Sequence, residues 1–366
     1  MLTMSGVVPH GRTIWDSALF PDDEQRQRLQ LVQAALVERE LDALVVFGNN
    51  RSHADLMYLG QMAPLEGFAL AIVPTEGELS LLGNIFALRD RGWSGARRTP
   101  LDGSLREVIG DKRRLGLVGF DVIPAVIYDR LFDGVPPEVS LSPADDLMRG
   151  LRRSLRPREI SAVREAAGVL DAALAELASS YQGGASNSQA VIDAERVARS
   201  RGAIDVQTLV SRTPAGEMMP IQTVGDPRLP SLTAYLALEY LGYRLDASLT
   251  LGAADPALLA SAGAALQAMR RHVRPGITAG QVAQAAMDVL DPEQLRVALR
   301  DGLGNAAGLD DAGQPLIAHD NQESLVKDMA LSLRVHLANG SSRAVVSDIV
   351  LVGANGATSL LHRPSK

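Results

Sequence analysis

The sequence predicts an α/β N-terminal domain followed by a second domain of helices and β-hairpins. In the first half of the chain, short apolar runs alternate with amphipathic segments, which is typical of strands alternating with helices. In the second half, long amphipathic segments surround a stretch rich in Leu, Tyr and Thr that is typical of a hairpin. The length of 366 residues also favours two domains over one.

Four segments define the first domain. Residues 22–40 are predicted to form a helix, because their apolar residues fall on one face and two aspartates at the start can cap the first turn. The run LDALVVFG at 41–48 ends in Gly and is predicted as a buried strand. Residues 68–83 predict two strands around a Glu-Gly turn, and residues 113–121 predict another strand.

The composition changes between residues 148 and 160, where five arginines lie close together. Pro157 follows them, and Pro is favoured at the first position of a helix. Residues 157–178 then place Ile, Val, Ala and Leu side chains on one helical face. We therefore predict two domains, 1–153 and 154–366.

The second domain is predicted to contain further helices at 187–201, 256–273 and 278–290. Asp255-Pro256 and Thr278 are typical helix starts. Between the first two of these helices, residues 231–252 predict a β-hairpin with Gly242 at its turn.

The composition excludes several classes of protein. Apolar residues make up 46% of the chain and charged residues 22%, which is typical of a globular protein. No apolar run approaches the ~18 residues of a membrane span, and the N-terminus lacks the order of a signal peptide, so we expect a cytoplasmic protein without a membrane partner. The absence of cysteine excludes disulfides, thiolate nucleophiles and cysteine zinc sites. The net charge is −7 with both signs interspersed, so nucleic acid is not an expected partner.

One run suggests a nucleotide site at first sight. GLGNAAG at 302–308 fits a degenerate dinucleotide fingerprint, but it opens no βαβ unit and no helix pattern follows it. We therefore expect no cofactor.

Six segments, in the order of the chain, carry motifs of a known family. They are LDALVVFG with YLG at 58–60, LRRSLRPREISAVREAA at 151–167, GYRLDASLTLG at 242–252, VRPGITAGQVAQAA at 273–286, KDMALSL at 327–333 and SDIVLVGANGATSLL at 347–361. Together they resemble the creatinase, prolidase and aminopeptidase P family over nearly the whole chain. The resemblance implies that the second domain has the α+β pita-bread fold, with helices around a curved antiparallel sheet. It also implies a homodimer.

Enzymes of that family mostly bind two divalent metals through two Asp, one His and two Glu, and the metals activate a water and polarise a carbonyl. The resemblance places these five ligand positions on Tyr235, Asp246, Asp301, Arg334 and Ser347. Only Asp246 keeps its residue type. Arg334 puts a fixed positive charge where a carboxylate belonged, and such a charge repels a divalent ion. We therefore predict a divergent member that has lost the metal ligands and binds no metal.

The substrate-facing histidines of the family also lack a counterpart. One position falls near Met218 or Met219, and the other falls near Gly308 or Leu309. We expect Met219 on the substrate side of the cavity together with Arg334 and Ser347. Glu217 is a candidate for the cavity mouth, and an ordinary loop charge is the alternative.

Creatinase has the family fold and hydrolyses a C–N bond without metal, using a His and carboxylates. The resemblance therefore implies a metal-independent hydrolase of a small amino-acid-like or amide substrate. Asp246 or Asp301 would be the base, Tyr235 a proton donor or anchor, and Arg334 would bind a substrate carboxylate or an oxyanion. His336, two residues beyond Arg334, is a relocated catalytic candidate or a partly buried histidine of the strand.

A second interpretation stays open. Arg334 and the two aspartates would form a charge-satisfied core, and the protein would be a non-catalytic binding or scaffold protein, a pseudopeptidase. The geometry of the cavity discriminates between the two. An enzyme needs an open pocket with Arg334 incompletely paired, whereas a filled pocket with a fully paired Arg334 argues against catalysis.

Overall fold

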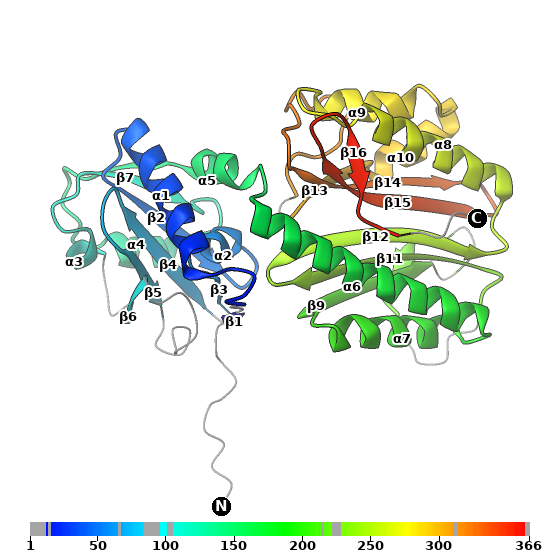
Figure 1. Ribbon diagram of the computed structural model, residues 1–366, viewed down its shortest axis with the longest axis horizontal. Coiled ribbons are helices and arrows are strands. Elements are labelled where there is room, and N and C mark those ends of the chain that lie inside the picture. The colour runs from blue at the N-terminus through cyan, green and yellow to red at the C-terminus, as the bar shows by residue number, and fades with distance from the viewer. Residues whose placement is uncertain are drawn as a thin grey trace, which may run out of the picture. The chain divides into compact units, whose positions relative to one another are not determined.

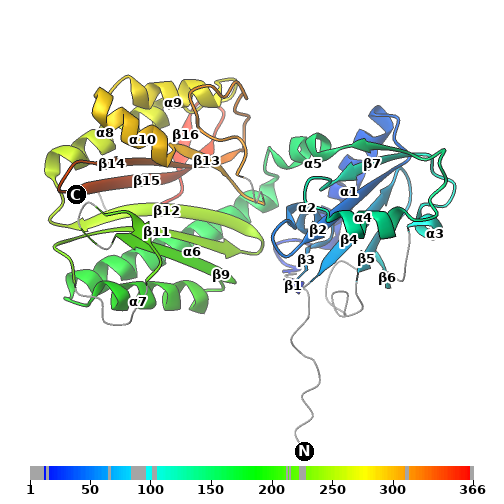
Figure 2. The same ribbon diagram turned by 180° about the vertical axis from the view of Figure 1, so that it is seen from behind.

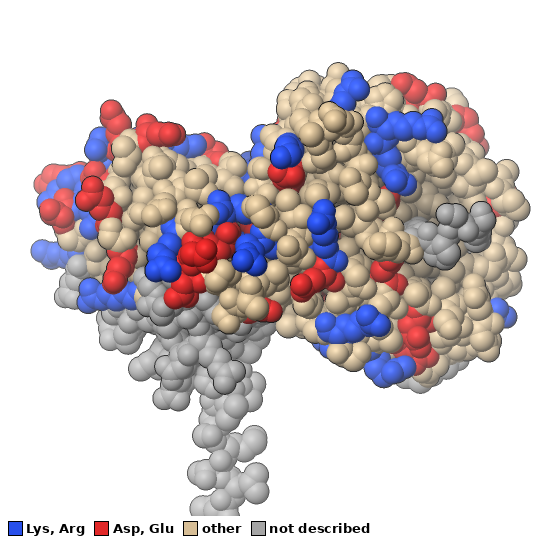
Figure 3. All heavy atoms as spheres, in the orientation of Figure 1, with Lys and Arg blue, Asp and Glu red and all other residues tan. Residues whose placement is uncertain are grey.

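The chain divides into two compact units, Met1–Arg153 and Ser154–Lys366. The computed structural model describes residues 12–13, 16–64, 67–83, 96–100, 105–211, 213, 216–221, 228–309 and 313–362. Within these ranges no helix is long and apolar enough to cross a membrane. On the face drawn in Figure 3, basic and acidic side chains are interspersed on each unit.

The first unit is built on a six-stranded sheet in the order β6-β5-β4-β2-β7-β8 (Figure 1). Its strands are β2 (Ala43–Asn49), β4 (Phe68–Pro74), β5 (Leu79–Gly83), β6 (Ala96–Pro100), β7 (Arg114–Val118) and β8 (Ser140–Pro143). Strand β4 runs antiparallel to β2 and β5, whereas β2, β7 and β8 are parallel neighbours, as are β5 and β6. A two-stranded ladder joins β1 (Arg12–Thr13) to β3 (Met62–Ala63). The apolar runs predicted as strands all lie on the large sheet.

Helices cover both faces of this sheet, which makes the unit an α/β domain as predicted. They are α1 (Asp22–Glu38), α2 (Ala54–Gly60), α3 (Arg106–Ile109), α4 (Ala125–Phe132) and α5 (Asp145–Arg152). Helices α1, α2 and α5 lie on one face, and α3 and α4 lie on the other (Figures 1 and 2). One detail differs from the prediction. The N-cap of α1 is Pro21, and the two aspartates lie in the first turn, where negative charge favours the helix dipole.

Arg28 of α1 is buried inside the first unit. Its Nε donates to Glu24 Oε1 at 3.1 Å, and its Nη1 donates to the carbonyl of Tyr58 at 3.3 Å. The guanidinium also lies over the rings of Phe20 and Tyr58, at 5.0 and 4.9 Å from their centroids. A fully buried cation of this kind is tolerated because a carboxylate and two aromatic faces replace its water.

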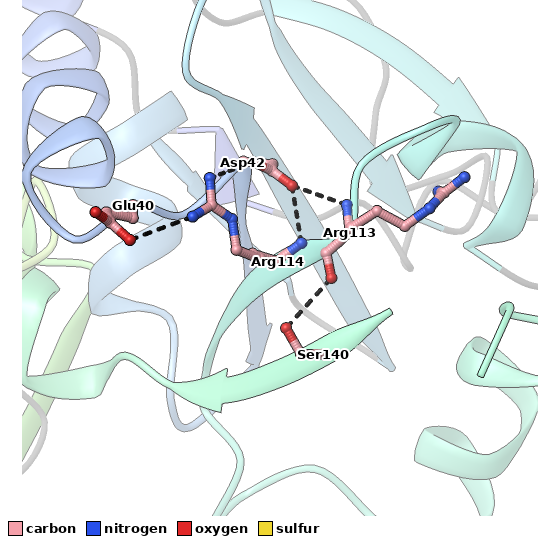
Figure 4. A network of polar contacts seen from close by, with 5 residues as sticks. All are labelled: Glu40, Asp42, Arg113, Arg114 and Ser140. Carbon is pink, nitrogen blue, oxygen red and sulfur yellow. Dashed lines mark hydrogen bonds and ion pairs between the residues drawn. The ribbon is translucent and has the colours of Figure 1, made fainter. Parts of the chain in front are cut away.

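Asp42 is the centre of a hydrogen-bond network at the end of the sheet where β7 begins (Figure 4). Its Oδ2 accepts hydrogen bonds from the backbone N–H groups of Arg113 and Arg114 at 2.8 and 2.9 Å, and its Oδ1 accepts one from the Arg114 side chain at 3.2 Å. These contacts, led by the two backbone bonds, lower the pKa of Asp42. Glu40 adds a contact to the Arg114 guanidinium, and Ser140 of β8 donates to the Arg113 carbonyl. The network therefore ties β7 and β8 to the segment that enters β2.

The second unit contains two four-stranded antiparallel sheets, ordered β10-β9-β11-β12 and β13-β14-β15-β16. The strands are β9 (Asp205–Ser211), β10 (Met218–Met219), β11 (Ser231–Tyr240), β12 (Tyr243–Gly252), β13 (Gly304–Ala307), β14 (Ala330–Ala338), β15 (Arg343–Val352) and β16 (Ala357–Ser359). The predicted hairpin is β11–β12. Leu241 and Gly242 form its turn with φ values of 51° and 86°, which explains the glycine.

Helices pack on the outer side of both sheets (Figures 1 and 2). Those on the β9–β12 sheet are α6 (Pro157–Gln182) and α7 (Asn187–Ser200), and those on the β13–β16 sheet are α8 (Pro256–His272), α9 (Ala279–Met287) and α10 (Pro292–Asp301). The Asp255 side chain caps α8, and Thr278 forms a capping box with Gln281 at the start of α9. The unit therefore has the helix-covered antiparallel architecture expected of the pita-bread fold.

Serine hydroxyls join the two sheets where β12 lies beside β14 and β15. Ser332 of β14 donates to the carbonyl of Asp246 at 2.9 Å. Ser347 of β15 donates to the carbonyl of Ser248 at 3.0 Å and accepts from the N–H of Ser248 at 2.7 Å. Hydrogen bonds from serine side chains therefore connect strands of the two sheets here, as backbone hydrogen bonds do within each sheet. They hold β12 against β15 and against β14, the strand that carries Arg334.

Candidate active site

An open cavity of about 390 Å³ lies on the sheet surface of the second unit. Its floor is a row of register partners, Gln207 of β9, Ala237 of β11 and Asp246 of β12, which therefore point to the same face. The described lining comprises Gln207, Tyr235, Ala237, Arg244, Leu245, Asp246, Asn305, Ala306, Gly313, Leu316 and Arg334. A volume of this size accommodates a small molecule.

Arg334 and Asp246 form an ion pair in this cavity. Arg334 Nη1 lies 3.0 Å from Asp246 Oδ2, and the same nitrogen donates to Asn305 Oδ1 at 2.8 Å. The two charged side chains are 19% and 12% exposed, so the pair is partly shielded from water but still reachable. Among the described residues, hydrogen bonds are recorded only from Nη1 of this guanidinium. Its Nε and Nη2 have no hydrogen-bond partner within that part of the chain.

Tyr235 of β11 supplies a neutral hydroxyl to the same cavity. Burial and the negative charge of Asp246 raise its pKa to about 12, although Arg334 and Arg244 act in the opposite direction. The phenol therefore stays protonated across the physiological range and serves as a hydrogen-bond donor rather than as a base.

Asp301 lies in a separate, closed cluster at the end of α10. Its Oδ2 is 3.0 Å from Arg343 Nη1, and its Oδ1 accepts from Arg300 Nε at 2.7 Å. Burial raises the pKa of Asp301, but His336, Arg300 and Arg343 outweigh burial, so the pKa lies well below its ordinary value. A carboxylate held in this way is a poor proton acceptor, and it is not among the described residues that line the cavity.

His336 belongs to the closed cluster as well. Its Nδ1 lies 3.7 Å from Asp301 Oδ2, and its side chain is only 6% exposed. Burial lowers the pKa of His336 and Arg334 and Arg343 lower it further, whereas Asp301 acts to raise it. Its Nε2 is buried and has no hydrogen-bond partner among the described residues. The histidine is therefore neutral and shielded from the open cavity.

The structure separates the predicted site residues into three groups. Tyr235, Asp246 and Arg334 meet in the open cavity, and Asp301 and His336 lie in the closed cluster. The predicted substrate-binding residues Ser347, Glu217 and Met219 are not among the described residues that line this cavity, and Ser347 lines another one beside Asp348 and Ser359. Their role in substrate binding stays a prediction.

The structure shows the surroundings of each of these three residues. Ser347 is 2% exposed, and its hydroxyl is engaged by the backbone of Ser248. Glu217 is exposed in the segment that precedes β10. Met219 is 40% exposed on β10, the strand that pairs with β9 on the side away from β11.

Four further polar residues were missed by the sequence analysis. Arg244 and Gln207 line the cavity because they fall on the same strand face as Asp246, a relationship that the alternation of β12 and its pairing to β9 could have indicated. Asn305 and Arg343 act through contacts with residues distant in the sequence, at separations of 29 and 42 residues, which no local pattern encodes.

The residues do not fit the two divalent metals that the family resemblance implies. The described chain contains no group of three or more His, Asp or Glu side chains able to hold a metal ion. Asp246 already shares an oxygen with Arg334, and Asp301 is bound by two arginines. Hard divalent ions take several oxygen ligands, so one paired carboxylate beside an amide is an insufficient donor set.

Comparison with known proteins agrees with the fold. The chain is 25% identical over 370 residues to the probable dipeptidase PepE of Mycobacterium tuberculosis, covering 95% of this chain and 97% of that protein. The crystal structure of dipeptidase PepE from Mycobacterium ulcerans has a TM-score of 0.76 at 24% identity, covering 96% of this chain and 97% of that one. The prolidase from Pyrococcus horikoshii has a TM-score of 0.78 at 16% identity, covering 92% and 99%.

The C-terminal unit also matches a family model. Residues 161–354, more than half of the chain, match the model of metallopeptidase family M24. This range contains the cavity, the closed cluster and the joint between the two sheets. The pita-bread fold, the order of its motifs and this match lead to one conclusion: the chain is a member of metallopeptidase family M24, in its creatinase, prolidase and aminopeptidase P branch.

Proposed function

We propose that this protein is a metal-independent hydrolase that cleaves a C–N bond in a small amino-acid-like or amide substrate. The observation that carries the proposal is the open cavity in which Asp246, Arg334 and Tyr235 meet. Its volume of about 390 Å³ suits a small molecule, and two nitrogens of Arg334 have no hydrogen-bond partner among the described residues.

The three residues have complementary roles in this reaction. Asp246 accepts a proton from the attacking water as the water oxygen bonds to the carbonyl carbon. Arg334 binds a substrate carboxylate or the developing oxyanion through its remaining donors, and the protonated hydroxyl of Tyr235 donates to the same oxygen. As the C–N bond breaks, the proton held by Asp246 passes to the leaving nitrogen. Water is consumed, and an acid and an amine are released.

The test is hydrolysis of a panel of dipeptides and N-acyl amino acids. Hydrolysis is measured as the release of amine, with and without EDTA. The comparison includes Asp246→Asn, Tyr235→Phe and, as a matched control, Asp320→Asn, whose side chain is exposed outside the cavity. We expect activity that survives EDTA and is lost in Asp246→Asn but retained in Asp320→Asn. Amine release that appears only after a divalent metal is added would refute the proposal.

The ion pairs favour a second candidate, a non-catalytic binding or scaffold protein. Asp301 and His336, which would be natural acid–base partners, are enclosed with Arg343, so Asp246 is left as the carboxylate of the described cavity. This candidate predicts that panel compounds bind, as measured by calorimetry, without being cleaved.

A further inference from the structure

We infer that the guanidinium groups of Arg334 and Arg343 take the place of two cations, each as the built-in counter-ion of one carboxylate. Arg334 Nη1 lies 3.0 Å from Asp246 Oδ2, and Arg343 Nη1 lies 3.0 Å from Asp301 Oδ2. The two acids stand at positions that the family resemblance assigns to metal ligands. Each carboxylate therefore has a buried or partly buried arginine where its cation would be, and Asp301 has the exposed Arg300 as a second contact. The inference holds whether or not the cavity is catalytic.

Both arginines are fixed in these positions. Arg334 is held by Asn305, whose Oδ1 accepts from the same nitrogen that pairs with Asp246. Arg343 begins β15, and its side chain is only 5% exposed. Its Nε is buried without a hydrogen-bond partner among the described residues, which is costly, and the charge of Asp301 offsets that cost.

The negative charge of the centre is balanced without an external ion. The two aspartates are opposed by three arginines, Arg334 at Asp246 and Arg343 with Arg300 at Asp301, so the positive charges already outnumber the negative ones. A divalent ion at either carboxylate would meet a fixed positive charge 3.0 Å from the oxygen it has to bind. It would have to displace that guanidinium.

Removing one of these arginines should therefore leave a carboxylate that a soluble cation can neutralise. The test compares the melting temperatures of the parent, Arg334→Gln, Arg343→Gln and Arg300→Gln, each in EDTA and in millimolar MnCl₂. Arg300 is the matched control, because it also contacts Asp301 but its side chain is 58% exposed.

We expect Arg343→Gln to lower the melting temperature by about 10 °C and Arg334→Gln by several degrees, with Arg300→Gln close to the parent. Mn²⁺ should restore part of the loss in Arg334→Gln, where the carboxylate faces the open cavity, and should leave the parent and Arg300→Gln unchanged. If Arg343→Gln does not fold, Arg334→Gln alone decides the question. The inference is overturned if the parent gains as much from Mn²⁺ as Arg334→Gln does, if Mn²⁺ has no effect on Arg334→Gln, or if a folded Arg343→Gln is as stable as Arg300→Gln.

Discussion

Arg334 and Asp246 face each other across two sheets, joined by a contact of 3.0 Å between residues 88 positions apart in the chain. Asn305 of β13 accepts a second hydrogen bond from the same nitrogen at 2.8 Å. One guanidinium nitrogen thereby links β12, β13 and β14. The position of β13 should consequently control how Arg334 presents its remaining donors to the cavity.

Gly304→Ala tests this dependence. Gly304 precedes Asn305 and has a φ of 143°, and a Cβ added there would lie 2.3 Å from the carbonyl oxygen of Ser332. We expect β13 to move away from β14 at a cost of about 1–3 kcal/mol in the free energy of unfolding. Urea unfolding measures this cost. Gly340→Ala is the control, because its added Cβ would meet nothing within 4 Å. Equal stability of the two variants would contradict the prediction.

Tyr235 should ionise later than an ordinary tyrosine. Its pKa of about 12 means that the folded protein keeps the proton that the unfolded chain releases near pH 10. The contribution of the protonated Tyr235 to the free energy of unfolding is therefore complete below pH 10 and is lost as the pH rises from 10 to 12. The measurement is tyrosinate absorbance, titrated in the parent and in Tyr235→Phe. The difference between the two curves should rise near pH 12, and a midpoint near pH 10 would show that Tyr235 is not shielded as described.

Asp301→Asn should weaken the protein most at neutral pH. The pKa of Asp301 is lowered in the folded state, so its charge stabilises the fold above the unfolded-state pKa of ~3.9, and this contribution is lost as the pH falls below that value. We expect Asp301→Asn to melt below the parent at pH 7, and the gap to narrow between pH 4 and pH 3. Asp288→Asn, on an exposed helix end, should melt like the parent throughout. A gap independent of pH would contradict the ionic explanation.

Arg28→Met should unfold the first unit more easily without disturbing the cavity of the second. The substitution removes the buried ion pair with Glu24 and two ring contacts, at a cost of about 3–5 kcal/mol. Denaturant unfolding measures the loss, and calorimetry with a compound that binds the parent checks that affinity is retained. Arg26→Met is the matched control on the exposed face of α1. If both variants lose equal stability, the buried pair is not the reason.

The architecture could be predicted from the sequence because its signals are local. The apolar stripe of α1 and the turn at Gly242 act over a few residues, and the structure keeps them. Short helices such as α2 and α10 were missed, since seven and ten residues give little periodicity to detect. The order of the motifs along the chain then indicated the family fold.

The site could be predicted only in part, because contacts between residues far apart in the sequence decide which side chains face the cavity. Motif positions brought Asp246, Arg334 and Tyr235 together in the predicted cavity. They could not show that Arg343 would enclose Asp301, because that contact spans 42 residues. Nor could they show that the hydroxyl of Ser347 bonds to the backbone of the neighbouring strand.

The tight turn at Leu241 and Gly242 also has a kinetic consequence. Tyr235 and Asp246 lie on the two arms of one hairpin whose ladder runs from Tyr240↔Tyr243 to Ser231↔Gly252. A hairpin of this kind closes within about microseconds, whereas contacts between distant segments form later because loop closure is entropically costly. The acid and the phenol should therefore be in place early in folding. The guanidinium of Arg334 should join them later, when β14 docks beside β12, and we expect that step to complete the cavity.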